Sequence, residues 1–246
     1  MIKKNFNNIF NFLPIKENLI DKIYKEKNKK FINKFYALSN KVAGESVNSK
    51  INQLIKKIKS NKIENIFISS PENVAWLLNL RGKDNPNSPV PNCKIILTNK
   101  KKIFFFSSPK KINRIKKNKQ YKNFTFCGYK DFSKIIHKLK GKNFCIDSLS
   151  CSISNESIIK KSFKIKLKID PCYLMKSIKN KSEIKNTVDT HFKDGLALTR
   201  FIYWIKNINK KKLTEIDAKN KLEKFRKLNK DYLFPSFDTI AGTGSN

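Results

Sequence analysis

The apolar and polar residues in the central part of the chain recur with helical and strand-like spacing in turn. In SVNSKINQLIKKIKSN the apolar positions share one helical face, which predicts an amphipathic helix beginning after a Ser46 cap. The apolar residues on that face are Val47, Ile51, Leu54, Ile55 and Ile58. The run IENIFIS that follows is short and almost continuously apolar, as in a buried strand. This stretch therefore predicts a helix packed against a sheet.

Further helix-like and strand-like segments alternate from there to about residue 170. Ser70-Pro71-Glu72 is typical of a helix start, because serine caps a helix and proline suits its first position. CKIILT and KIFFFSS, joined by NKK, predict an antiparallel hairpin. No glycine-rich turn follows the first strand, so a dinucleotide-binding fold is poorly supported. The pattern predicts an α/β fold, with a mixed sheet that carries helices on its faces.

The two ends of the chain differ from this central region. Residues 1–45 are rich in Asn and Lys and weakly patterned, as in a linker or the tail of another domain. After Asp170 the pattern predicts one long helix from about Ser182 to Asn207, then a second helix capped by Thr214. SFDTIAGTGSN is expected to begin as a strand and to stop in a glycine-rich turn. We expect residues 171–246 to open a domain whose remainder is not in this sequence.

The composition adds a large positive charge. The chain has 54 Lys+Arg against 19 Asp+Glu, a formal net charge of +35, and 50 of the basic residues are Lys. Arginine, with its planar fork, is preferred for reading phosphates and bases, so this balance fits codon drift in an AT-rich genome better than a dedicated nucleic-acid surface. A dedicated surface would need its lysines clustered rather than scattered. No apolar stretch is long enough to span a membrane, so we expect neither a specific nucleic acid nor a membrane as partner.

The residues that most often bind metals do not form a recognisable set. The five cysteines include no CxxC pair, and neither histidine has a second histidine or a cysteine three or four residues away. Reduced, mostly buried thiols fit better than a disulfide framework or a zinc site. Core or surface positions are therefore favoured over metal binding for these residues, and the sequence assigns no metal ligand.

Four separated motifs resemble a known family in order and spacing. They are NVAWLLNLRGKDNPNSPV, LMKSIKNKSEIKNTVDTHFKDGLALTRFIYWI, LTEIDAKNKLEKFR and FPSFDTIAGTGSN. Across about residues 35–246 they resemble aminopeptidase P (Xaa-Pro aminopeptidase), of the M24 creatinase–prolidase family. The resemblance implies three parts: residues 1–45 as the tail of a first creatinase-like domain or a linker, 46–170 as a creatinase-like α/β domain, and 171–246 as the truncated start of a "pita-bread" catalytic domain, with its first helices and strand.

The resemblance also implies an activity. Such enzymes are cytoplasmic, commonly homodimeric metalloaminopeptidases that remove the N-terminal residue preceding proline from peptides. They use two divalent metal ions, usually manganese, held by two Asp, one His and two Glu. In the family these ligands follow the G-x-G-x-N turn, so none is assigned in this chain, which we expect to be inactive alone. The alternatives are a non-catalytic creatinase-N-like module for oligomerisation or binding and, with less support, a basic nucleic-acid-binding protein.

Few residues are candidates for a functional role. By resemblance, Arg81 could bind a substrate carboxylate or backbone; alternatively, it pairs with Asp84 and braces the loop. Gly242, Gly244 and Asn246 match the turn that approaches the active site in the family. The sequence assigns no catalytic residue.

Overall fold

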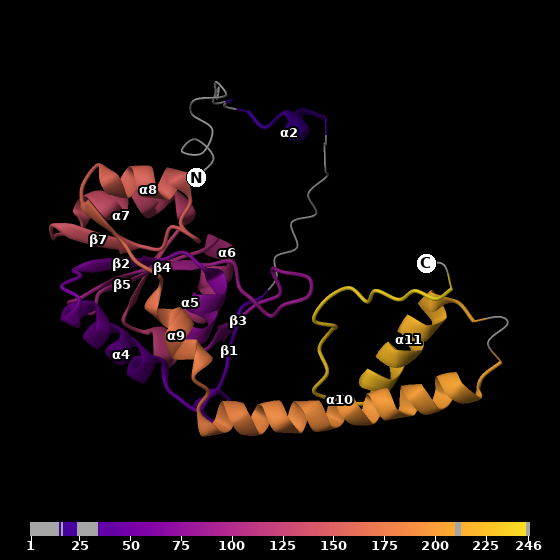
Figure 1. Ribbon diagram of the computed structural model, residues 1–246. Helices are drawn as coiled ribbons and strands as arrows, with labels where there is room; N and C mark the ends of the chain where they lie inside the picture. Colours follow the sequence, from indigo (N-terminus) through magenta and orange to yellow (C-terminus); the bar gives the residue numbers. More distant parts are fainter. Residues whose placement is uncertain (1–14, 16, 24–33, 210–212, 245–246) are drawn as a thin grey trace. The chain divides into compact units, whose positions relative to one another are not determined.

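The computed structural model describes residue 15, residues 17–23, 34–209 and 213–244 (Figure 1). The chain divides into two compact units, residues 1–32 and 33–246. In the first unit the structure describes one short helix, α2 (Leu19–Ile23). The second unit holds all the other described elements.

A six-stranded sheet forms the centre of the second unit, with the strand order β6-β5-β4-β2-β7-β8. Strand β4 runs antiparallel to both of its neighbours, β2 and β5, and the other neighbouring pairs are parallel. The strands are β2 (Asn65–Ile68), β4 (Lys94–Thr98), β5 (Ile103–Phe106), β6 (Phe124–Cys127), β7 (Asn143–Ile146) and β8 (Lys164–Leu167). The predicted antiparallel hairpin is therefore present as β4 and β5.

Helices cover both faces of this sheet, in Figure 1 with α7 and α8 on one face and α4, α5 and α9 on the other. They are α4 (Val47–Ser60), α5 (Pro71–Leu77), α6 (Pro109–Ile115), α7 (Phe132–Lys138), α8 (Ile153–Lys160) and α9 (Pro171–Ser177), with short 3₁₀ turns η1 (Lys119–Tyr121) and η2 (Tyr129–Asp131). This arrangement confirms the predicted mixed α/β sheet with helices on its faces.

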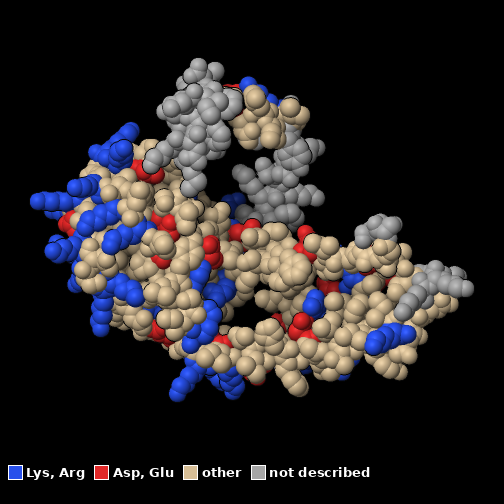
Figure 2. All heavy atoms as spheres, in the orientation of Figure 1, with Lys and Arg blue, Asp and Glu red and all other residues tan. Residues whose placement is uncertain are grey.

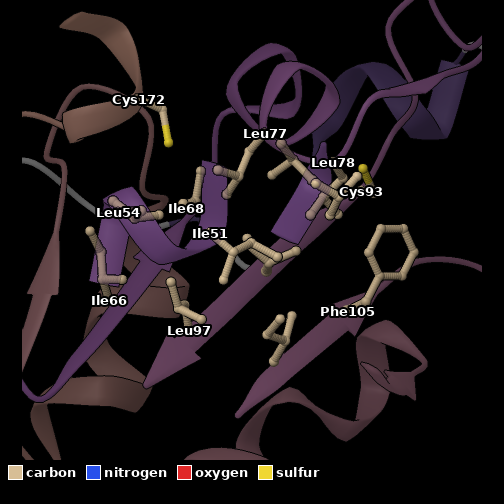
Figure 3. Packing of buried hydrophobic residues seen from close by; sticks show 14 of the residues in the cluster. Ile51, Leu54, Ile66, Ile68, Leu77, Leu78, Cys93, Leu97, Phe105 and Cys172 are labelled. Atoms are coloured by element: carbon tan, nitrogen blue, oxygen red, sulfur yellow. The ribbon is translucent and has the colours of Figure 1, made fainter. Parts of the chain in front are cut away.

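Alternate strand residues build a separate core on each face, because successive side chains of a strand point to opposite sides. Ile66 and Ile68 of β2 join the larger core, which includes Ile51 and Leu54 of α4 (Figure 3). Phe67, between them, joins the second core with residues of α7 and α8. The apolar face predicted for residues 46–61 is therefore the one that α4 buries.

A two-stranded sheet, β1 (Tyr36–Ala37) with β3 (Leu80–Arg81), joins the segment before α4 to the end of α5. Next to it Phe35 is only 5% exposed, and its ring lies edge-on to that of Phe105. A four-residue helix, α3 (Asn40–Ala43), follows and ends at Gly44. Phe35 is thus part of the α/β core and Ala43 is also buried, although the sequence pattern of this segment predicts little burial.

Two further helices, α10 (Lys181–Asn207) and α11 (Glu215–Arg226), follow α9. Each begins with a capping box, Asn180 with Glu183 and Thr214 with Asp217, as the sequence predicts for the second. Arg226 of α11 donates to both carboxylate oxygens of Asp194 in α10, at 2.7 and 3.2 Å. The observed limits of α10, Lys181–Asn207, agree with the long helix predicted from about Ser182 to Asn207.

The strand predicted at the start of SFDTIAGTGSN is absent, since residues 233–244 hold no strand in the described structure. A strand needs a neighbour to accept its backbone hydrogen bonds, and no described segment pairs with these residues. The residues that the structure describes contain no helix long and apolar enough to cross a membrane.

Candidate functional site

Arg81 lies at the end of β3, shortly after α5, and its guanidinium donates hydrogen bonds to backbone carbonyls of the same region. Its Nη1 donates to the carbonyl oxygens of Ala75, at 3.0 Å, and Leu80, at 2.9 Å. Burial lowers the pKa of Arg81 from its ordinary value, although arginine stays charged at any physiological pH. Arg81 therefore holds together the turn that joins α5 to β3.

The Arg81–Asp84 ion pair is not present, so the prediction that these two residues pair was wrong. Asp84 instead forms an ion pair with Lys111 of α6 and accepts a 2.7 Å hydrogen bond from the backbone N–H of Asn92. Both side chains of the ion pair are only 12–13% exposed. Asp84 thus connects its own loop to α6 and to the segment before β4.

A cavity of about 250 Å³ lies beside Arg81, between α5 and the first turns of α10. Its lining includes the cationic side chains of Lys50 and Arg81, the indole of Trp76, and Glu183 from α10. The remaining lining residues are Leu38, Val42, Ala43, Asn79, Lys179, Asn186 and Thr187. The cavity is therefore built where the α/β region meets the start of the long helix.

Lys50 is the most unusual residue of this cavity, because it is only 1% exposed although it lies on α4. Its Nζ donates to the carbonyl oxygen of Trp76 at 3.0 Å and to Oδ1 of Asn79 at 2.8 Å, and lies 4.2 Å from the centre of the Trp76 ring. Burial lowers its pKa to about 8, against the opposing charges of Glu183 and Glu45. Lys50 is thus a buried cation held by acceptors and an aromatic face.

Asn79 completes this network with a strained backbone. It is 1% exposed and has a φ of +49°, a left-handed conformation that asparagine tolerates better than most residues. Its Nδ2 donates to the carbonyl oxygen of Glu45 at 2.8 Å, and its own carbonyl accepts from the N–H of Leu38 at 2.8 Å. Asn79 therefore joins the turn after α5 to α4 and to the segment before α4.

The start of α10 is fastened to this region by direct hydrogen bonds. Trp76 donates its indole N–H to Glu183 Oε1 at 3.2 Å, and Glu183 Oε2 accepts from the N–H of Asn180 at 2.9 Å. Asn180 and Asn186 donate to the carbonyl oxygens of Ala43, at 2.9 Å, and Val42, at 3.0 Å. The arrangement can position α10 and offer positive charge to a small polar group.

The described residues do not fit a dinuclear metal centre. They contain no group of three or more His, Cys, Asp or Glu that could hold a metal ion. All five cysteines are unpaired, and four are buried. Burial raises the thiol pKa of Cys145 to about 11, so this sulfur stays protonated and is a poor ligand or nucleophile. Within the described part of the chain, this site therefore contains no candidate set of metal ligands.

The predicted approach turn lies far along the chain from this cavity. Gly244 has a φ of +64°, the conformation that favours glycine, and no heavy atom of a described residue other than its chain neighbours lies within 4 Å of where a Cβ would be. Gly242 is in the same irregular segment, and Asn246 lies outside the described residues. Gly242 and Gly244 contribute no side chain to the Arg81 cavity.

Sequence reasoning missed Lys50, Asn79 and Glu183, although one signal was available for the first. Lys50 occupies the same helical face as Val47, Ile51 and Leu54, so the period that predicts α4 also places this lysine inside. Asn79 lies within the apolar run WLLNLR, where a polar residue needs buried partners. Glu183 is recognisable as a helix cap, but its bond to Trp76 joins residues 107 positions apart.

Comparisons with known proteins agree with this architecture. The profile described as creatinase/prolidase N-terminal domain matches residues 26–183. Xaa-Pro aminopeptidase 1 of Dictyostelium discoideum is 29% identical over 94% of this chain, and Xaa-Pro aminopeptidase ApepP of Drosophila melanogaster is 28% identical over 95%. The chain spans only 38% and 39% of these two relatives.

The fold is also found in a solved structure. The X-prolyl aminopeptidase of Caenorhabditis elegans, described as a cytosolic enzyme with a di-nuclear active site, superimposes with a TM-score of 0.81 at 23% identity. The match covers 94% of this chain and 39% of that enzyme. Since the family profile covers more than half of the sequence, this chain belongs to the creatinase/prolidase N-terminal domain family.

Proposed function

We propose that this chain is the N-terminal portion of a metal-dependent Xaa-Pro aminopeptidase, which removes an N-terminal residue preceding proline from peptides. The supporting observation is that α10 leaves apolar side chains exposed. Its start is bonded to the α/β region through Glu183, yet Ile184, Val188 and Phe192 are 53%, 63% and 77% exposed. An amphipathic helix normally buries such a face against more protein. The remaining catalytic domain would supply that cover.

The division of the chain follows from the same proposal. Residues 46–170 would be a complete creatinase-like α/β domain, and residues 171–246 the start of the pita-bread catalytic domain. Residues 1–45 would be the tail of a first creatinase-like domain or a linker. The packing of Phe35 into the core argues for ending that segment earlier, before residue 35.

The full-length enzyme would use two divalent metal ions, manganese in our proposal. Such a pair activates a water molecule and stabilises the developing charge on the carbonyl under attack. We assign no ligand to this chain, since its described residues do not fit the pair. The chain alone is therefore expected to be inactive.

Arg81 is proposed to serve the substrate in the complete enzyme, while Asp84 braces the loop that follows it. Nη1 of Arg81 is committed to two carbonyls, but the side chain also lines the cavity next to Glu183. A substrate carboxylate could then approach the rest of the guanidinium fork. Gly242, Gly244 and Asn246 would form the turn that leads to the active site.

The remaining features of the proposal concern assembly and location. We propose a homodimer in the cytoplasm that acts on peptides with proline at the second position. The cytosolic description of the C. elegans enzyme supports the location.

The direct test is to incubate this chain with an Xaa-Pro peptide in manganese-supplemented buffer and to measure release of the N-terminal amino acid. We expect no release above buffer, with a full-length Xaa-Pro aminopeptidase as positive control. Turnover by this chain, lost on chelation, would contradict the placement of the metal ligands outside it.

A further inference from the structure

The lysines of the α/β region are concentrated at one edge of the sheet. Parallel strands begin at one edge and end at the other, so the segments before β2, β5, β6, β7 and β8 share the amino-terminal edge. These segments carry exposed Lys59, Lys62, Lys100, Lys101, Lys102, Lys116, Lys117, Lys119, Lys122, Lys138, Lys140, Lys142, Lys160 and Lys161. We call this set the lysine edge. Figure 2 shows blue side chains gathered at the left, beside α4 and β7 as labelled in Figure 1.

The opposite edge of the same sheet provides an internal comparison. Its connecting segments follow β2, β5, β6, β7 and β8, and they are rich in serine: residues 69–71, 107–110, 128–131, 147–152 and 168–170. They mix a few lysines with Asp131, Asp147 and Asp170. The lysine edge has one acidic residue in its segments, Glu64, whose carboxylate accepts the N–H groups of Lys142 and Asn143. Codon drift acts on all solvated loops alike, so it does not account for this one-sided distribution.

A groove of about 550 Å³ opens on the lysine edge. It is lined by Lys101, Lys119 and Lys122, by the half-buried ring of Phe124, and by the first residues of α4. The positive end of the α4 dipole adds to the lysine charges. The amide side chains of Asn40, Asn48, Gln120 and Asn123 complete the polar lining.

The chemistry of this surface indicates what it can bind. None of the exposed large apolar side chains of the described residues lies in the segments that carry the lysine edge. A protein partner normally buries an apolar centre, and a peripheral membrane protein inserts apolar or aromatic side chains. A surface of cations, amides and one aromatic ring instead suits a charged strand whose bases can stack and form hydrogen bonds. Neighbouring strands are about 4.8 Å apart, so six strands give an edge of roughly 24 Å for several phosphates.

We propose that the lysine edge and its groove bind single-stranded nucleic acid without sequence preference, a role separate from peptide hydrolysis. Lysine acts as a point charge toward phosphates and does not read base edges bidentately. Binding would therefore be strongly dependent on salt and tolerant of sequence.

The test is fluorescence anisotropy of a labelled oligouridine of about twenty nucleotides with the complete chain, over a range of salt concentrations. The groove variant is Lys101→Gln, Lys119→Gln, Lys122→Gln. The control is Lys110→Gln, Lys130→Gln, Lys134→Gln, which removes the same charge from exposed residues near the opposite edge. We expect the groove variant to weaken binding roughly tenfold to a hundredfold at 0.1 M salt, and to lower the salt slope by about 2. The control should lose less than about threefold, because distant charges are screened.

Equal losses in the two triple variants would overturn the proposal, because net charge alone would then explain the binding. A wild-type affinity that does not change with salt would also overturn it. Two competitors separate the other classes of partner: a polyglutamate peptide, and phosphatidylserine vesicles. Tighter binding of either one than of the oligouridine would assign this surface to an acidic protein or to a membrane.

Discussion

Asn180, the residue that caps α10, occupies the space next to Gly44 that any larger residue would need. A Cβ on Gly44 would lie 2.6 Å from Asn180 Cγ, and Gly44 has a φ of +73°. Asn180 Oδ1 accepts from the N–H of Glu183 at 3.0 Å, while its Nδ2 donates to the Ala43 carbonyl at 2.9 Å. The end of α3 and the start of α10 are thus fitted to each other through one glycine and one asparagine.

Gly44→Ala is expected to lower the free energy of unfolding by about 2 kcal/mol. The left-handed backbone costs about 1 kcal/mol for a residue with a Cβ, and displacement of the Asn180 cap costs about another 1 kcal/mol. Urea unfolding followed by tryptophan fluorescence measures the change. The matched control is Gly195→Ala within α10, where no atom lies within 4 Å of the new Cβ and helix propensity favours alanine by about 1 kcal/mol. Equal effects of the two variants would show that the contact with Asn180 is unimportant.

The loop after β3 offers a test of which residue Asp84 uses as partner. We expect Asp84→Ala and Lys111→Ala to be coupled by about 1 kcal/mol or more in a double-mutant cycle, because the ion pair is largely buried. Asp84→Ala and Arg81→Ala should instead be additive within about 0.5 kcal/mol, since no bond joins them. Chemical denaturation of the single and double variants supplies the data. Coupling confined to the Arg81 cycle would restore the pairing that the sequence suggests.

The burial of Lys50 leads us to expect a specific pH dependence of the free energy of unfolding. Burial lowers its pKa to about 8 from an ordinary value of 10.5, so between these limits the unfolded chain holds a proton that the folded chain has lost. Because the unfolded state then binds more protons, the contribution of Lys50 to the free energy of unfolding rises with pH across this window, by about 1–3 kcal/mol. Below pH about 8 this residue contributes no slope.

The measurement compares unfolding of the wild type and Lys50→Met between pH 7.5 and 10.5. Other groups titrate equally in both proteins, so the difference between the two curves isolates Lys50. We expect wild-type stability to rise relative to Lys50→Met, whereas Lys56→Met, on the exposed side of α4, should follow the wild type. Parallel curves for the wild type and Lys50→Met would contradict the burial of this charge.

Local patterns predicted the parts of the fold that depend on neighbouring residues. The spacing of Val47, Ile51 and Leu54 predicts α4, and Ser70-Pro71 predicts the start of α5. The start of α5 is where the pattern predicts it, but Ser70 does not cap the helix as the pattern suggests. The Ser70 hydroxyl makes no capping bond and has no hydrogen-bond partner within the described structure. Proline, with its fixed φ and no N–H, is sufficient to begin the helix there.

The site was less predictable because its bonds join distant parts of the chain. Arg81 was identified by resemblance, but its two carbonyl acceptors depend on the turn between α5 and β3. Lys50 meets Asn79 across 29 residues, and Trp76 meets Glu183 across 107. The lysine edge is equally hidden in the sequence, since its members become neighbours only when parallel strands are aligned.

Sequencing the transcript beyond the codon for Asn246 tests whether this chain is the N-terminal portion of a metalloaminopeptidase. We expect it to continue, in frame or after a frameshift, into an N-G-A-x-x-H-Y stretch and then two Asp, one His and two Glu with the spacing of the family's metal ligands. Coding sequence unrelated to such a domain would contradict the claim and leave a creatinase-N-like module without catalytic function.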